Sequence, residues 1–212
     1  MTEGFHQKEA FKLTYNVSRE TMSKFEKYED ILKASQKKFN LIGKSTENKI
    51  WARHFYDSAF SCKFVLEIIG RTEKKKLSLV DVGSGAGFPG LVIALMCQKI
   101  SNVSFTLIES NKKKASFLEC IVSLLGLKVK VINSRAEEQK KKFDLITARA
   151  VAPLNKLVKL VCKISKKNSR SHQDLSKSPQ MSANVNKSQK QLQQISANLA
   201  KLNESHQHLS KS

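Results

Sequence analysis

The chain has 212 residues, a formal net charge of +20 and 26% charged residues. This length suits one full domain with its own core and is short for two independent domains. The basic residues recur in separate runs, "EKKKL", "NKKKAS" and "QKKKF", which excludes a single basic tail. This distribution predicts attraction to a polyanion, either a nucleic acid or an anionic membrane surface. A solvated Lys-rich surface would also explain the runs.

Four scattered cysteines, at positions 62, 97, 120 and 162, include no Cys-x-x-Cys pair. This spacing is typical of reduced thiols in a cytosolic protein rather than of a disulfide framework or a zinc site. The first ten residues lack a signal-peptide core, and no apolar run approaches the roughly 20 residues that span a bilayer. We therefore expect a cytoplasmic protein that binds no metal and does not span a membrane. We also expect a monomer whose partner is not a membrane.

Two helical segments are predicted in residues 1–70, which we interpret as an N-terminal helical cap. From Ser18 onward, apolar residues fall near one face of a helix, with Lys and Glu on the other face. They are Met22, Phe25, Leu32 and Phe39. After a turn around Gly43, a second helix near residues 48–69 carries an apolar set of its own. Its members are Trp51, Phe55, Ala59, Cys62 and Val65.

Short apolar runs alternate with helical segments in residues 71–167. The predicted strands are residues 77–82, 103–108, 129–132 and 143–147. The predicted helices are residues 91–97, 115–125 and 154–165, and Gly126 is a candidate left-handed C-cap. This alternation implies right-handed crossovers, and so an α/β fold with a parallel, doubly wound sheet.

The composition changes at residue 168, and residues 168–212 contain no glycine and no aromatic residue. A weak heptad of apolar residues runs through this polar tail. It consists of Val185, Leu192, Ile195, Leu199, Leu202 and Leu209. We expect either disorder or one amphipathic helix near residues 186–206.

The segment "LVDVGSGAGFPG" predicts a ligand site where the first strand turns into a helix. Gly83, Gly85 and Gly87 have no Cβ, so backbone N–H groups can approach a ligand closely. The same stretch satisfies the G-x-G-x-x-G dinucleotide fingerprint, and a glycine-rich turn that serves packing alone also stays open. Asp81 favours S-adenosylmethionine, because its carboxylate would repel a pyrophosphate and attract an ammonium group. Glu109 could accept hydrogen bonds from the ribose of either cofactor.

Several segments in order carry a family resemblance. They are "VDVGSGAGFPGL", "LIESNKKKASFL", "NSRAEE" and "FDLITARAVAPL", preceded by "FNLIGKS" and "RHFYDSA". Over about residues 20–165 the chain resembles the 16S ribosomal RNA guanine-N7 methyltransferases, the RsmG or GidB family. The resemblance implies a Rossmann-like class I fold, S-adenosyl-L-methionine as cofactor, and 16S ribosomal RNA or the small ribosomal subunit as partner.

The resemblance also implies cofactor-binding positions at Gly83, Phe88, Ala136, Glu137 and Arg149. The first two lie in the glycine segment, the next two beside the adenine, and the last follows the fourth strand. The general logic of such folds adds Asp81, Gly85, Gly87 and Glu109. A plainer reading of Arg149 is a surface arginine that faces phosphate.

The predicted acceptor is guanine N7, and no catalytic residue is assigned. The fourth strand runs into "TARAVAPL", which has neither the Asn/Asp-Pro-Pro-aromatic motif of amine methyltransferases nor a cysteine nucleophile. Guanine N7 carries an in-plane lone pair and needs no base to expose it. The same lack suits a catalytically inactive RNA-binding remnant, which stays open beside a nicotinamide-dependent oxidoreductase.

RNA contacts are predicted at Lys112, Lys113 and Lys114, at the start of a helix. The helix dipole disfavours cations there, so a phosphate backbone that neutralises them would explain their placement. Arg53 and His54 are further candidates for RNA or domain-interface contacts. His54 and Asp57, three residues apart on a helix, could also contact each other.

The resemblance stops after Lys167, where family members continue with further strands that complete the sheet. Without such strands, the fourth strand would be an exposed edge. We expect the cofactor residues, which all lie upstream, to bind even so.

Overall fold

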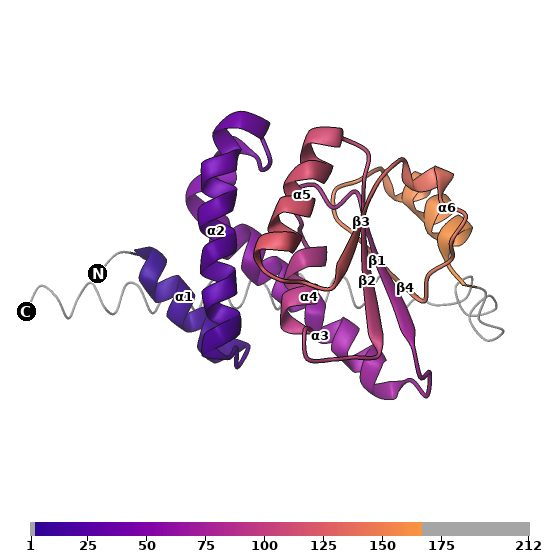
Figure 1. Cartoon of the computed structure of the whole chain (residues 1–212), viewed down its shortest axis with the longest axis horizontal. Coiled ribbons are helices and arrows are strands. Elements are labelled where there is room, and N and C mark those ends of the chain that lie inside the picture. The colour runs from indigo at the N-terminus through magenta and orange to yellow at the C-terminus, as the bar shows by residue number, and fades with distance from the viewer. Residues whose placement is uncertain (1–2, 167–212) are drawn as a thin grey trace, which may run out of the picture. The chain divides into compact units, whose positions relative to one another are not determined.

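Four parallel strands form the sheet, in the order β3-β2-β1-β4. A computed structural model of the chain describes residues 3–166, so the predicted helix near residues 186–206 and the rest of the tail lie outside the described residues. The strands are β1 (Leu77–Val82), β2 (Val103–Glu109), β3 (Val129–Asn133) and β4 (Leu145–Ala148). The predicted parallel, doubly wound sheet is confirmed (Figure 1).

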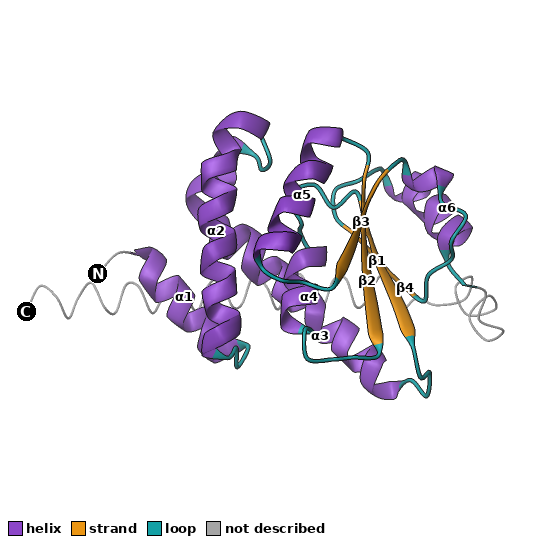
Figure 2. Ribbon diagram, in the orientation of Figure 1, coloured by secondary structure: helices purple, strands orange, loops and turns teal. Residues whose placement is uncertain are grey.

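Helices cover both faces of the sheet (Figure 2). The helices that follow β1 are α4 (Gly90–Met96), α5 (Lys112–Leu124), the short 3-10 turn η3 (Ala136–Glu138) and α6 (Leu154–Ile164). On β1, Leu79 packs in one cluster with Ile93 of α4, and Val80 packs in another with Leu160 of α6. Every residue of β1 is buried, as expected for a central parallel strand.

The N-terminal helices pack on the same side of the sheet as α4 and α5 (Figure 1). They are α1 (Glu3–Thr14), α2 (Arg19–Phe39), the 3-10 helix η1 (Lys44–Lys49), the π-helical turn η2 (Trp51–Phe55) and α3 (Tyr56–Arg71). Phe25 and Tyr28 of α2 share one hydrophobic cluster with Leu91 of α4 and Phe117 of α5. Within residues 3–166, no helix is long and apolar enough to cross a bilayer.

Capping side chains account for two helix starts. The Ser18 hydroxyl accepts a hydrogen bond from the Thr21 amide at 3.2 Å, so α2 begins where the sequence predicts. The Asn111 side chain accepts from the Lys114 amide at 3.1 Å, and α5 therefore begins at Lys112 rather than at the predicted residue 115.

Other boundaries differ from the predictions. β4 begins at Leu145 and not at Phe143, because Phe143 pairs with Ser165, beyond α6, in an isolated parallel bridge. The predicted helix near residues 48–69 is divided among η1, η2 and α3, and α1 was not predicted. Phe39 is 36% exposed, unlike the other predicted apolar residues of α2, whereas Gly126 has the expected left-handed conformation with φ +61°.

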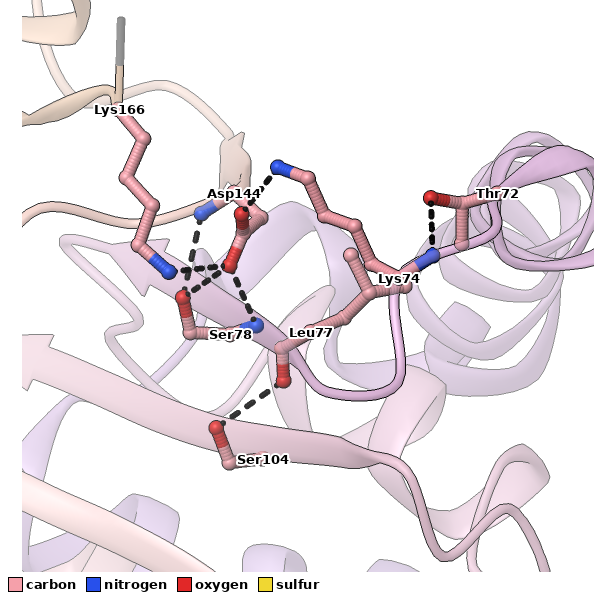
Figure 3. A network of polar contacts seen from close by, with 7 residues as sticks. All are labelled: Thr72, Lys74, Leu77, Ser78, Ser104, Asp144 and Lys166. Atoms are coloured by element: carbon pink, nitrogen blue, oxygen red, sulfur yellow. Dashed lines mark hydrogen bonds and ion pairs between the residues drawn. The ribbon is translucent and has the colours of Figure 1, made fainter. Parts of the chain in front are cut away.

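A network around Asp144 joins the segments at the amino ends of β1 and β4 (Figure 3). Its carboxylate accepts hydrogen bonds from the amide and hydroxyl of Ser78, at 2.9 and 2.6 Å. Lys74 and Lys166 approach the same carboxylate at 2.8 and 2.6 Å. These donors hold the pKa of Asp144 below its usual range, although burial opposes them. One buried carboxylate thus connects the start of the sheet to the end of α6.

Replacing Asp144 with Ala should lower the free energy of unfolding by about 2–3 kcal/mol, because it leaves buried donors without their acceptor. Urea titration measures this change. The matched control is Asp30→Ala, at an exposed acid on α2, for which we expect a change within about 0.5 kcal/mol. Equal effects of the two substitutions would contradict the structural role of Asp144.

Candidate functional site

The strand order reverses between β1 and β4. From β1 the chain continues through β2 to β3 on one side, and then crosses to β4 on the other side of β1. Doubly wound sheets bind ligands outside the carboxyl ends of their strands at such a reversal. The segments that follow these ends, residues 83–89, 110–111 and 149–153, therefore surround the candidate site.

The glycine segment after β1 forms the predicted tight turn. Gly83, Gly85 and Gly87 all have positive φ, at 64°, 58° and 99°. A Cβ at Gly87 would overlap the side chain of Leu91 and the hydroxyl of Tyr28. The Tyr28 hydroxyl also donates a hydrogen bond to the carbonyl of Ala86. Helix α2 thus holds this turn from outside the sheet.

Asp81 lies beneath the turn and is fully buried. Its carboxylate accepts hydrogen bonds from the Gly90 amide at 3.1 Å and from the Thr147 hydroxyl at 2.8 Å. Burial raises its pKa to about 6, although these donors and the positive charge of Arg149 act in the opposite direction. The carboxylate therefore ties the start of α4 to β4 across the candidate site.

Glu109, at the end of β2, contacts the glycine turn and is 7% exposed. Its two oxygens accept from the amides of Gly85 and Asn111, at 2.9 and 2.8 Å. A carboxylate oxygen has two lone pairs, so each can accept a further hydrogen bond, as the predicted ribose contact requires. That contact stays a prediction.

Phe88 connects the turn to the N-terminal helices and is 4% exposed. Its ring stacks on Tyr28 at a centroid distance of 5.4 Å and on His54 at 4.9 Å. It also meets Phe55 edge to face, and the guanidinium of Arg149 lies 5.4 Å from its centroid. The predicted cofactor residue Phe88 is therefore fixed on several sides by aromatic and cationic groups.

Arg149 follows β4 and is held by residues of η2. Its guanidinium approaches His54 Nδ1 at 2.9 Å and donates to the Arg53 carbonyl at 3.3 Å. Burial, together with the positive charges of Arg149 and Arg53, lowers the pKa of His54 to about 4, so the imidazole is neutral at pH 7. The partners of His54 are Arg149 and Thr46, and no hydrogen bond to Asp57 is found within residues 3–166.

The two predicted residues after β3 lie on the other side of the sheet from the cap. Ala136 is buried in the cluster that contains Val82 of β1 and Leu160 of α6. Glu137 is exposed, and its carbonyl accepts from Lys163 at 2.5 Å. The structure therefore brings the glycine turn, Phe88 and Arg149 into contact, while Ala136 and Glu137 have no direct contact with them among the described interactions.

The predicted RNA residues differ in exposure. Lys112 and Lys113 are exposed at the start of α5, Lys114 is partly buried, and none of the three forms a salt bridge within residues 3–166. Arg53 is exposed as well. His54 is 8% exposed, so an RNA contact would require its ring to leave its place between Phe88 and Arg149.

Three residues that support this site were not singled out from the sequence. They are Tyr28, Thr46 and Thr147. Tyr28 shares the spacing of the apolar face that contains Phe25 and Leu32, and this could have indicated its burial. Nothing in the sequence pairs Thr46 with His54 or Thr147 with Asp81, because those contacts depend on how the segments pack.

Gly90→Ala should destabilise the fold by about 1–3 kcal/mol through overpacking. A Cβ at Gly90 would lie 2.5 Å from Leu107 Cδ2 and 2.6 Å from Asp81 Cβ. The control is Gly70→Ala, on an exposed part of α3 with no atom within 4 Å of the added carbon, which should be neutral or stabilise by up to about 1 kcal/mol. Thermal or urea unfolding measures both, and a neutral result at Gly90 would contradict this close packing.

The contributions of His54 and Asp81 to the free energy of unfolding should depend on pH in opposite directions. The unfolded chain binds more protons at His54, whose pKa falls from 6.5 to about 4 on folding, so acidification through this range destabilises the fold. The folded chain binds more protons at Asp81, whose pKa rises from 3.8 to about 6, so acidification through that range stabilises it. Each effect amounts to about 1–2 kcal/mol between pH 7 and pH 5, and the two largely cancel.

Asp81→Asn removes one of these opposing effects and keeps an acceptor toward Gly90. The variant should therefore lose about 1–2 kcal/mol more stability than the unmodified chain between pH 7 and pH 5. Urea unfolding of both proteins at the two pH values measures the difference. Identical pH dependences would contradict the shifted pKa of Asp81.

Several curated proteins are similar to this chain over most of its described part. The Ribosomal RNA small subunit methyltransferase G of Orientia tsutsugamushi (strain Ikeda) is 37% identical over 146 residues, which cover 69% of this chain and 68% of that protein. The protein of the same name from Cereibacter sphaeroides (strain ATCC 17025 / ATH 2.4.3) is 40% identical over 147 residues, covering 68% of this chain and 67% of that protein.

A solved structure of a SAM-dependent methyltransferase from Thiobacillus denitrificans, in complex with S-adenosyl-L-homocysteine, is 16% identical over 50% of this chain and 44% of that chain. Its TM-score of 0.38 is too low to bear on function.

A family model described as GidB, rRNA small subunit methyltransferase G, matches residues 21–210. This match extends past residue 167, where the resemblance in the sequence was expected to stop. It covers most of the chain, and the chain therefore belongs to the GidB family of rRNA small subunit methyltransferase G proteins.

Proposed function

We propose that this chain transfers the methyl group of S-adenosyl-L-methionine to N7 of a guanine in 16S ribosomal RNA. The observation that carries the proposal is the glycine turn at the strand-order reversal, braced by the buried carboxylates of Asp81 and Glu109, in a chain of this family. The curated relatives are named as methyltransferases of the small-subunit ribosomal RNA. The choice of guanine N7 comes from the resemblance to the 16S ribosomal RNA guanine-N7 methyltransferases, and the chemistry of the site agrees with it.

The residues at the turn suit this cofactor, which supplies a methyl group on a positively charged sulfur. Asp81 contributes negative charge beneath the turn, which favours a cationic ligand over a pyrophosphate. Glu109 has lone pairs for ribose hydroxyls at the end of β2. Arg149 has no salt-bridge partner within residues 3–166, and its guanidinium suits the carboxylate of the cofactor. Ala136 and Glu137 remain proposed contacts on the side of β3.

The arrangement suits an acceptor that needs no deprotonation. Guanine N7 carries an in-plane lone pair, so the protein mainly has to align the two reactants and exclude water. Both nitrogens of His54 are engaged, by Thr46 and Arg149, so this histidine is not available as a general base. Phe88 and the aromatic residues around it supply an apolar wall beside the turn.

The proposed partner is 16S ribosomal RNA, alone or within the small ribosomal subunit, in the cytoplasm. The net charge of +20 favours a polyanion and disfavours close association of two copies, which supports a monomer. Lys112 and Lys113 lie at the carboxyl edge of the sheet, on the same edge as the glycine turn.

We also propose that the chain is divided into an N-terminal helical cap of residues 1–70 and a cofactor-binding core of residues 71–167.

The first experiment measures cofactor binding. S-adenosylhomocysteine at 100 times its dissociation constant should raise the free energy of unfolding by about 2.7 kcal/mol, and NAD should raise it little. A larger stabilisation by NAD would favour an oxidoreductase.

The second experiment incubates unmodified small-subunit RNA or particles with the chain and labelled S-adenosylmethionine, and then maps the labelled base. Label at one guanine N7 is expected. Cofactor binding with no transfer of label would favour the RNA-binding remnant.

The double variant Lys112→Ala/Lys113→Ala should weaken RNA binding and reduce the slope of log affinity against log salt by about 1–2, because two phosphate contacts are lost. The matched control, Lys75→Ala/Lys76→Ala, removes two exposed lysines just before β1, at the opposite edge of the sheet. Binding titrations at several salt concentrations measure both slopes. Equal slopes for the two variants would place the RNA elsewhere.

A further inference from the structure

A chain of hydrogen bonds runs from η1 to the residue that follows β4. The Thr46 hydroxyl lies 2.8 Å from the Gly43 carbonyl and 2.9 Å from His54 Nε2. On the other side of the ring, His54 Nδ1 lies 2.9 Å from an Nη atom of Arg149. Two side chains of the N-terminal helices are thus linked in series to the arginine at the candidate cofactor site.

Only one assignment of donors fits this chain. A guanidinium can only donate, so His54 Nδ1 must accept from Arg149. A neutral imidazole then carries its proton on Nε2 and donates it to Thr46. The Thr46 hydroxyl can accept that bond and donate its own hydrogen to the Gly43 carbonyl. Thr46 therefore stabilises the tautomer that presents a lone pair to Arg149.

The surroundings of His54 keep this arrangement in place. The residue is 8% exposed, and its ring stacks on Phe88. Two arginines place positive charge near the ring: Arg149, which follows β4, and Arg53, which lies on the same turn as His54. Asp57 of α3 lies close enough to interact with both arginines. Both cations oppose a second proton on the ring, which would convert Nδ1 into a donor and break the bond to Arg149.

Arg149 needs such support if it is to recognise an anion. A long arginine side chain loses much rotamer freedom when it is ordered, and that loss weakens binding unless the side chain is already held. Here His54 and the Arg53 carbonyl take two of its five N–H donors, and Phe88 lies beneath the guanidinium. The remaining donors are left for a ligand at the carboxyl edge of the sheet.

We propose that His54 is a positioning residue that holds Arg149 in its anion-binding orientation through Nδ1, with Thr46 fixing the tautomer. The inference deepens the proposed function and rests on it, because the anion is the carboxylate of the bound S-adenosylmethionine. It gives the N-terminal helical segment a defined part in cofactor binding.

A matched pair of substitutions separates the two nitrogens of His54. In His54→Asn the amide oxygen can occupy the position of Nδ1 and accept from Arg149, whereas His54→Gln carries a donor near the position of Nε2 and offers no acceptor at Nδ1. Both variants lose the stacked ring, and the Arg149→Met background controls for the difference of one methylene group between them. Calorimetric titration with S-adenosylhomocysteine at pH 7.5 gives the dissociation constants, and thermal unfolding without ligand shows whether each variant is folded.

We expect the dissociation constant of His54→Gln to exceed that of His54→Asn by about tenfold, the size of one hydrogen bond to a charged group. Thr46→Val should weaken binding and Thr46→Ser should not. In an Arg149→Met background, the two His54 variants should bind equally, because the positioned group is gone.

The outcomes separate this inference from the proposed function. If the unmodified chain does not bind S-adenosylhomocysteine, the proposed function fails and the inference fails with it. If the unmodified chain binds and the Asn and Gln variants bind equally, the positioning role is overturned while the proposed function stands. A difference between these variants that persists in the Arg149→Met background would also overturn it, since the effect would then not pass through Arg149.

Discussion

The buried carboxylate of Asp81 is the constraint on which the rest of the site depends. A charged group at 0% exposure is costly unless donors surround it, and the donors here come from Gly90 and Thr147. To supply them, α4 must begin directly over the end of β1, with a glycine where any side chain would collide. The position of the glycine turn, and of the edge at which we propose that the cofactor binds, follows from satisfying this one acid.

The N-terminal helices complete the site from outside the sheet. Tyr28 bonds to the turn at the Ala86 carbonyl, and Phe88 of the turn inserts among Tyr28, Phe55 and His54. Because these contacts join the N-terminal helical cap to the glycine turn through a common aromatic core, a shift of the cap would also move the turn. A change in the packing of α2 or η2 would therefore alter the positions of the residues at the candidate site.

Much of the fold was predictable from the sequence because it depends on local patterns. Short apolar runs located the four strands, and period-3.6 spacing located the N-terminal helices. The Ser18 cap marks the predicted start of α2, whereas the Asn111 cap starts α5 earlier than predicted. The glycine turn was also predictable, because Gly83, Gly85 and Gly87 occupy conformations that other residues rarely adopt. Boundaries failed where distant segments decide them, as where Phe143 pairs with Ser165.

The sequence alone therefore determined the fold class, the chain order of the four strands and of the helices between them, the glycine turn and the family resemblance, because these depend on residues close together in the chain. The tertiary structure decided which distant groups meet. It brings His54 to Arg149 rather than to Asp57, and it gives Asp81 two donors from separate elements. Hydrogen bonds and stacking act only over a few ångströms, so a pairing between residues nearly a hundred positions apart depends on how the helices pack against the sheet.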